Sequence, residues 1–263
     1  MLDPELVYSV FSGIPGGFRR AMLTEYLQCK ALEYIYNSTL SKGLVFMGGT
    51  ALRIFYGTRR FSEDLDFDSR DVTFQQFTEL LQTVGKEFRL EGVSCEVTAK
   101  RPGAFTGTVR FTGILQDWNL TPHRDEVLRL KIDADPQDYD YSPDIRILNR
   151  FDTTATVPVA PDSLILAQKL RAILERNRVM ARDLYDAAYL FGRTEPDMEY
   201  LLRKQGTDNR LELKKRINEK LSRRDIKRLA SDLAPFLPDR RETIKVELFP
   251  EILLNWAEAD SVT

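Results

Sequence analysis

A double glycine followed by two closely spaced aspartates constrains this chain more than any other sequence feature. Residues 44–47 form an apolar run long enough for a buried strand, and Gly48 and Gly49 interrupt it. A second strand is predicted to begin at Asp64, where the two-residue period places Asp64 and Asp66 on one face. We therefore expect a strand, a glycine turn and a helix, followed by a strand that presents two carboxylates.

The glycines and the aspartates predict two kinds of ligand. Residues 50–56 have the composition of a short helix, and a helix that begins directly after Gly48 and Gly49 presents free backbone N–H groups, which favour phosphate. Two carboxylates on one strand face repel each other, and a divalent metal relieves that repulsion. The alternative is an ordinary strand–turn–helix in which Asp64 and Asp66 are solvated loop charges.

The residues around these motifs resemble the AbiEii/AbiGii toxin family of nucleotidyltransferases, within the DNA polymerase β-type superfamily. The resemblance lies in four short matches: Gly48-Gly49-Thr50-Ala51-Leu52, Tyr56-Gly57, Arg60-Phe61-Ser62 and Asp64-Leu65-Asp66-Phe67. It implies an α+β fold, in which a polymerase β-type nucleotidyltransferase domain with a mixed sheet and flanking helices precedes an all-helical domain. It also implies metal-dependent transfer of a nucleotidyl group from an NTP.

Composition excludes several other kinds of site. With one histidine, His123, and two cysteines, Cys29 and Cys95, the chain lacks the ligands for a multi-histidine or zinc–cysteine site, so carboxylates must hold any catalytic metal. The formal net charge of −2 argues against the global basic field of general nucleic-acid binders. No signal peptide and no apolar run of roughly 20 residues is evident, so we expect a cytoplasmic protein without a membrane partner.

Residues 127–133 alternate as a strand that supplies a third acidic candidate. The leucines and the isoleucine of this strand are predicted to face the core, whereas Lys131 and Asp133 share the opposite face. By resemblance, a polymerase β-type site takes its third carboxylate from a strand beside the Asp-x-Asp strand, and Asp133 is the candidate. Asp135 could replace it if the strand ended early. The alternative is an amphipathic strand with one wet face.

The composition changes at Pro161, where a mixed α+β pattern gives way to helical patterns alone. We therefore predict a nucleotidyltransferase domain over residues 1–160 and a helical domain over residues 161–263. A strand is predicted over residues 153–159, and Pro158 predicts that this strand lies at a sheet edge.

A third set of matches lies in the helical region. The sequences Lys169-Leu170-Arg171-Ala172 and Arg182-Asp183-Leu184-Tyr185-Asp186 resemble later motifs of the family. The resemblance implies active-site roles for Lys169 and Asp183, and a lysine is a point charge suited to a triphosphate. For Arg182 and Asp186 the alternative is a helix ion pair of little energetic weight.

Three overlapping sets of site residues follow from these motifs. The predicted catalytic residues are Asp64, Asp66, Asp133, Lys169 and Asp183. The predicted nucleotide-binding residues are Gly48, Gly49, Thr50, Arg60, Ser62, Lys131 and Lys169. The predicted ligands for Mg²⁺ or Mn²⁺ are Asp64, Asp66 and Asp133.

The resemblance also implies partners. Relatives act in toxin–antitoxin or phage-defence systems, and some modify the tRNA 3′ end while others are described as GTP-binding. We therefore expect a toxin-type enzyme that takes an NTP, with the tRNA 3′ end as an acceptor and an antitoxin regulator that acts without an obligate complex. Nucleotidylation of a small molecule or a protein, and a catalytically silent nucleotide-binding module, are the alternatives.

Overall fold

The structure is a computed structural model that describes residues 1–101 and 103–259. It divides the chain into two compact units, which we describe separately. The first contains Met1–Phe55 and Phe61–Ala160, and the second contains Tyr56–Arg60 and the chain from Pro161 onward. The second unit thus includes a short segment that the division by sequence assigned to the first.

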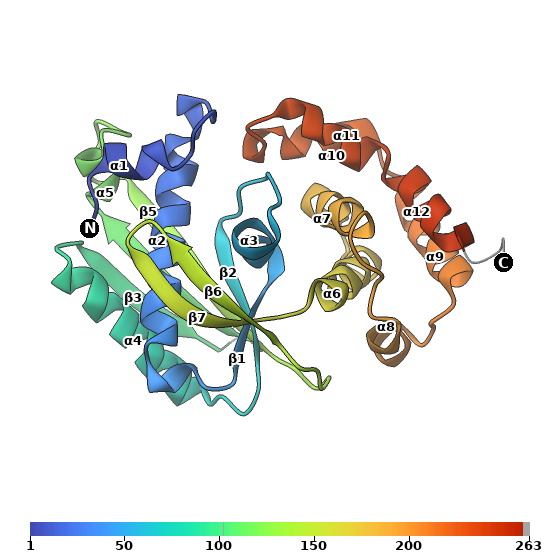
Figure 1. Cartoon of the computed structure of the whole chain (residues 1–263), viewed down its shortest axis with the longest axis horizontal. Helices are drawn as coiled ribbons and strands as arrows, with labels where there is room; N and C mark the ends of the chain where they lie inside the picture. Colours follow the sequence, from blue (N-terminus) through green and yellow to red (C-terminus); the bar gives the residue numbers. More distant parts are fainter. Residues whose placement is uncertain (102, 260–263) are drawn as a thin grey trace. The chain divides into compact units, whose positions relative to one another are not determined.

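A mixed sheet forms the centre of the first unit (Figure 1). Its strands are β1 (Leu44–Met47), β2 (Asp64–Ser69), β3 (Cys95–Lys100), β4 (Phe105–Thr112), β5 (Val127–Pro136), β6 (Asp144–Arg150) and β7 (Thr153–Val159). They lie in the order β3-β4-β5-β2-β1-β7-β6. β2 is parallel to β5, β1 is parallel to β7, and the other neighbouring pairs are antiparallel. The turn predicted at Pro102 and Gly103 includes Pro102, which lies outside the described residues.

Two long helices pack against this sheet. The helices of the unit are α1 (Pro4–Ser9), α2 (Arg19–Tyr36), α3 (Gly48–Ala51), α4 (Phe74–Leu90) and α5 (Ile114–Asp117). α2 packs on β7 and β5, α4 packs on β3 and β4, and the two helices contact each other. Thr73, which the sequence predicts as an N-cap, caps α4 through a capping box with Gln76. The helix predicted over residues 50–56 begins earlier, at Gly48, and its second half is a π-helical turn.

The two faces of the central strands separate the core from the acidic side chains. Leu65 and Phe67 of β2 are buried, as are Leu128, Leu130 and Ile132 of β5. These residues alternate with the acidic and basic positions, so the predicted inward face of both strands is confirmed.

The prediction that Pro158 confines its strand to a sheet edge is wrong, because β7 lies between β1 and β6. β1 pairs with β7 at Phe46 and Val159, one residue beyond Pro158, so this pairing needs no N–H group from the proline. The strand at this edge of the sheet is β6, which the sequence patterns did not predict. Its Ile145 and Ile147 are mainly exposed and its Leu148 is buried, so the alternating apolar residues do not mark the face that packs inward.

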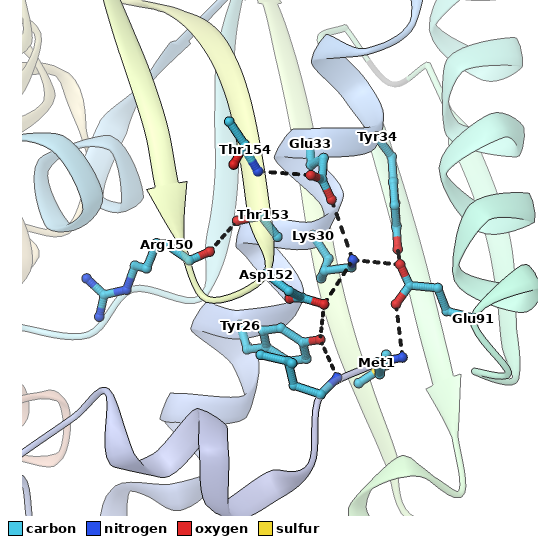
Figure 2. A network of polar contacts seen from close by, with 11 residues as sticks. Met1, Tyr26, Lys30, Glu33, Tyr34, Glu91, Arg150, Asp152, Thr153 and Thr154 are labelled. Atoms are coloured by element: carbon cyan, nitrogen blue, oxygen red, sulfur yellow. Dashed lines mark hydrogen bonds and ion pairs between the residues drawn. The ribbon is translucent and has the colours of Figure 1, made fainter.

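A partly buried polar network ties α2 to neighbouring elements of the first unit (Figure 2). The Lys30 ammonium lies 2.6 Å from Glu91 and 3.5 Å from both Glu33 and Asp152. Burial by itself lowers the pKa of Lys30, but the hydrogen bond to Glu91 and the nearby carboxylates outweigh it and raise the pKa. The Tyr26 hydroxyl donates to Asp152 at 3.4 Å. Because Glu91 follows α4 and Asp152 lies in the β6–β7 turn, the network connects three elements.

The second unit is helical from Pro161 to residue 259. Its α-helices are α6 (Asp162–Glu175), α7 (Ala181–Phe191), α8 (Met198–Gln205), α9 (Arg210–Leu221), α10 (Ile226–Leu233), α11 (Ile244–Glu247) and α12 (Phe249–Glu258). The sequence pattern predicts one helix over residues 241–257. The structure instead has a 3-10 turn followed by α11 and α12, because Pro250 starts a new helix. Tyr56–Arg60 is held in this unit partly by the Tyr189 hydroxyl, which donates to the Tyr56 carbonyl oxygen at 2.7 Å.

Candidate active site

The glycine turn contacts the Asp-x-Asp strand directly. Gly48 has a φ of +77°, a region that residues with a side chain rarely adopt. A Cβ atom at this position would also collide with the carboxylate of Asp66. The two residues approach each other because Met47 pairs with Asp66 in the β1–β2 ladder. The turn therefore requires glycine for two independent reasons, and the Asp66 carboxylate lies against its backbone.

Two side chains hold the chain that leads into β2. Thr50 Oγ1 donates to the carbonyl oxygen of Asp64 at 2.5 Å. Gln28 Nε2, on α2, donates to the carbonyl oxygen of Ser62 at 3.0 Å, and the Gln28 side chain is buried. Thr50 thus links the glycine turn to the first aspartate. No role was predicted for Gln28, although its position between the apolar residues Leu27 and Cys29 was a signal for one.

The three acidic candidates lie on two adjacent parallel strands. Asp66 of β2 is in register with Asp133 of β5, and Asp64 is in register with Lys131. Asp64 and Asp66 are two residues apart on one strand, as Lys131 and Asp133 are, so all four side chains project from the same face of the sheet. The structure therefore brings together the aspartates that were predicted from separate parts of the sequence.

Lys131 is the cation of this acidic group. Its ammonium donates a hydrogen bond to Asp133 Oδ2. That hydrogen bond, together with the fields of Asp133, Asp64 and Asp66, raises the pKa of Lys131 despite partial burial. The lysine consequently stays charged beside the three carboxylates.

The acidic group fits a divalent cation that is completed by other ligands. Its donors are carboxylate oxygens, which Mg²⁺ and Mn²⁺ prefer. Asp133 Oδ1 is buried and has no hydrogen-bond partner among the residues described. Within residues 1–101 and 103–259, no three acidic, histidine or cysteine side chains gather into a ready-made metal site. Mg²⁺ commonly binds one or two carboxylates and the phosphates of its substrate, so nucleotide oxygens would complete the shell.

The later motif residues form an ion-pair cluster within the second unit. Lys169 on α6 lies 3.2 Å from Asp183 and 2.9 Å from Asp186, both on α7. Arg60 Nε and Nη2 each donate to Asp186 at 2.6 Å, and Arg176 Nη1 donates to Asp183. Asp186 therefore pairs with residues outside its own helix. The sequence did not suggest that Arg60, assigned to nucleotide binding, has Asp186 as its partner.

Comparison with known proteins completes this description. A profile of the family described as "Nucleotidyl transferase AbiEii toxin, Type IV TA system" matches residues 30–255. The chain belongs to the AbiEii family. The matched range contains every predicted site residue, so family membership covers both motif regions. A search of curated proteins gave no match.

Two solved structures share the fold of this AbiEii chain. The first is JHP933 from Helicobacter pylori, with 23% sequence identity, coverage of 92% of this chain and 95% of that chain, and a TM-score of 0.56. The second, called a "putative nucleotidyltransferase from H. pylori", has 22% identity, coverage of 91% and 97%, and a TM-score of 0.56. At these identities the similarity establishes the fold, and the predicted nucleotidyltransferase architecture is confirmed.

Membership of the AbiEii family identifies the chain as a nucleotidyltransferase of the toxin–antitoxin type. An NTP substrate and an antitoxin partner follow from this membership at the level of the family. In the part of the chain that the structure describes, no helix has the length and apolar character needed to cross a membrane.

Substitution can decide between the two acidic candidates of β5. The strand continues to Pro136, so Asp133 lies within it beside Asp66, whereas the exposed Asp135 lies beside Asp68. We expect Asp133→Asn to lower nucleotidyl transfer by about 10²-fold, because a carboxylate of the site is lost. Asp135→Asn should leave the rate unchanged. Initial rates with a labelled NTP would measure both, and the reverse order would transfer the role to Asp135.

Proposed function

We propose that this AbiEii protein transfers a nucleotidyl group from an NTP to the 3′ end of a tRNA, with Mg²⁺ or Mn²⁺ held by Asp64, Asp66 and Asp133. One observation carries the metal assignment: Asp66 and Asp133 are neighbours across two parallel strands, on a face shared with Asp64. The buried Asp133 Oδ1, which lacks a hydrogen-bond partner among the described residues, supports it. When bound, the metal offsets phosphate charge and lowers the pKa of the attacking hydroxyl.

The residues of the turn and of β5 bind and orient the nucleotide in this proposal. Gly48 and Gly49 let the backbone approach the phosphates closely, since neither carries a side chain. Thr50 keeps the turn attached to β2 through the Asp64 carbonyl oxygen. Lys131 remains charged and supplies a cation for a phosphate oxygen. Most of the rate enhancement then comes from positioning and electrostatics.

Lys169 and Asp183 are included in the proposal on the strength of the family motif. Lys169 is an ammonium between two carboxylates, and its side chain retains 13% exposure. Asp183 is almost fully buried and accepts from both Lys169 and Arg176. We assign to Lys169 the role of binding a phosphate of the NTP, and to Asp183 the role of the carboxylate that orients Lys169.

Labelling of RNA tests the proposed acceptor. The purified protein is incubated with total tRNA, Mg²⁺ and each α-³²P-labelled NTP in turn, GTP first, beside Asp64→Ala. Label that appears on tRNA and is lost in the variant is the expected result. It would identify the acceptor and the nucleotide together.

Other results of the same assay would redirect the proposal. If label fails to reach RNA but appears on a protein or a small molecule, the tRNA acceptor is wrong and the transfer chemistry stands. If Asp64→Ala labels tRNA as fast as the unmodified protein, the metal assignment is wrong. A role in phage defence would be tested by expressing the unmodified protein and Asp64→Ala in separate infected cultures and comparing the phage yields.

A further inference from the structure

The ion-pair cluster of the second unit contains more positive than negative charge. Three cations, Arg60, Lys169 and Arg176, are joined by ion pairs to two carboxylates, Asp183 and Asp186. The formal charge of this five-residue cluster is therefore +3 − 2 = +1. An excess cation in a largely buried cluster favours the approach of an anion.

The ion pairs also show which cation is in excess. Asp186 is held by the guanidinium fork of Arg60, with two hydrogen bonds of 2.6 Å. Asp183 accepts a hydrogen bond from the guanidinium of Arg176. Lys169 contacts both carboxylates and is the sole partner of neither. If Lys169 moved to another anion, each aspartate would still keep an arginine.

Exposure distinguishes the residues that can reach a ligand from those that cannot. The side chains of Arg60, Asp183 and Asp186 are 3%, 1% and 0% exposed, whereas that of Lys169 is 13% exposed. Arg60 is therefore enclosed with Asp186, and its guanidinium is occupied by the fork. Arg176 is 42% exposed but pairs with Asp183 alone, whereas Lys169 contacts both aspartates and is more exposed than Arg60, the other cation on Asp186.

We propose that Arg60 and Arg176 are positioning residues that neutralise the two aspartates and so release Lys169 to bind a phosphate group of the NTP. This inference rests on the proposed function, because the phosphate is taken to belong to the nucleotide. It replaces the nucleotide contact predicted for Arg60 with an indirect role. Asp186, which lies 2.9 Å from the Lys169 ammonium, becomes its second positioning partner beside Asp183.

Removing one arginine should make the aspartate that it neutralised hold Lys169 more tightly. In Arg60→Gln, Lys169 becomes the one ion-pair partner of Asp186 among the described residues, and moving it would leave a buried carboxylate without that partner. We expect the dissociation constant of the NTP to rise by at least about tenfold, the size of one charge-assisted contact. The double variant Arg60→Gln with Asp186→Asn removes both charges, so NTP affinity should return close to that of the unmodified protein.

Equilibrium titration of ATP, GTP, CTP and UTP with Mg²⁺ measures these affinities without requiring transfer. Arg171→Gln is the matched control, because Arg171 lies on the same helix as Lys169 but pairs with Glu175 at 2.9 Å. It should leave NTP affinity unchanged, whereas Lys169→Met should weaken binding at least as much as Arg60→Gln. Thermal unfolding of each variant confirms that it is folded.

Arg176 provides a second pair if Arg60→Gln fails to fold. The Arg176 side chain is 42% exposed, so its loss is better tolerated. Arg176→Gln should weaken NTP binding, and adding Asp183→Asn should restore it. A role of Arg176 in direct phosphate contact would leave the double variant as weak as the single one.

The titrations overturn the inference if folded Arg60→Gln binds NTPs normally, or if neither double variant recovers affinity. They support it if both double variants recover. The transfer assay separates this inference from the proposed function. Recovery of affinity without transfer to any acceptor would contradict only the proposed function, and transfer without recovery would contradict only the role of the arginines.

Discussion

Replacing Asp66 with asparagine is expected to lower nucleotidyl transfer by about 10³-fold while the protein remains folded. Asp66 is the carboxylate that lies both against the Gly48 backbone and beside Asp133. The amide has nearly the same shape but supplies one weaker oxygen ligand and no negative charge. Initial rates of NTP-dependent labelling at saturating Mg²⁺ would measure the loss.

Asp68 provides the matched control for this substitution. It follows Asp66 by two residues on the same strand face, but it is buried and accepts a hydrogen bond from the Tyr141 hydroxyl at 2.6 Å. Asp68→Asn should change thermal stability far more than the transfer rate. Equal losses of transfer in the two variants would show that Asp66 acts only through strand structure.

Gly48→Ala is expected to have the second largest effect, a loss of transfer of at least about 10²-fold. The new methyl group would collide with the Asp66 carboxylate, and the alanine would also be strained at a φ of +77°. If Asp66 holds the metal as proposed, displacing its carboxylate even slightly misplaces the reacting groups. We further expect the free energy of unfolding to fall by about 1–3 kcal/mol. Transfer rates and denaturant unfolding would measure the two effects.

Gly92→Ala separates strain from collision. Gly92 has a φ of +84°, and nothing lies within 4 Å of a Cβ atom placed there. This variant should therefore lose stability through backbone strain and retain its transfer rate. If Gly48→Ala retained the same transfer rate as Gly92→Ala, contact between the turn and Asp66 would have no part in the activity.

Much of the first unit could be predicted because its local patterns agree with its tertiary environment. The run at Leu44–Met47 is buried and forms β1, and the alternation over residues 127–133 forms β5 with the predicted residues inward. The Asp-x-Asp strand was predicted in the same way. In each case, the apolar residues of the buried face follow one another in the sequence as a strand requires, so the local pattern identifies both the element and its buried face.

Other features escaped prediction because their determinants are not local. The alternating isoleucines of β6 are exposed, so its apolar residues do not mark an inward face, and the pairing with β7 decides its conformation. Pro158 is tolerated in an interior strand because the β1 pairing begins one residue later. Gln28 acquired its role from the carbonyl oxygen of Ser62, a partner far away in the sequence.

The sequence by itself determined the family, the glycine turn, the acidic strand and the alternation of β5, because each depends on neighbouring residues and a fixed period. Tertiary structure alone decided the register that places Asp66 beside Asp133, since a shift of one residue would turn Asp133 to the opposite face. It also decided that Arg60 pairs with Asp186. A buried charge must take a counterion from whatever element packs against it, and no local pattern records which element that is.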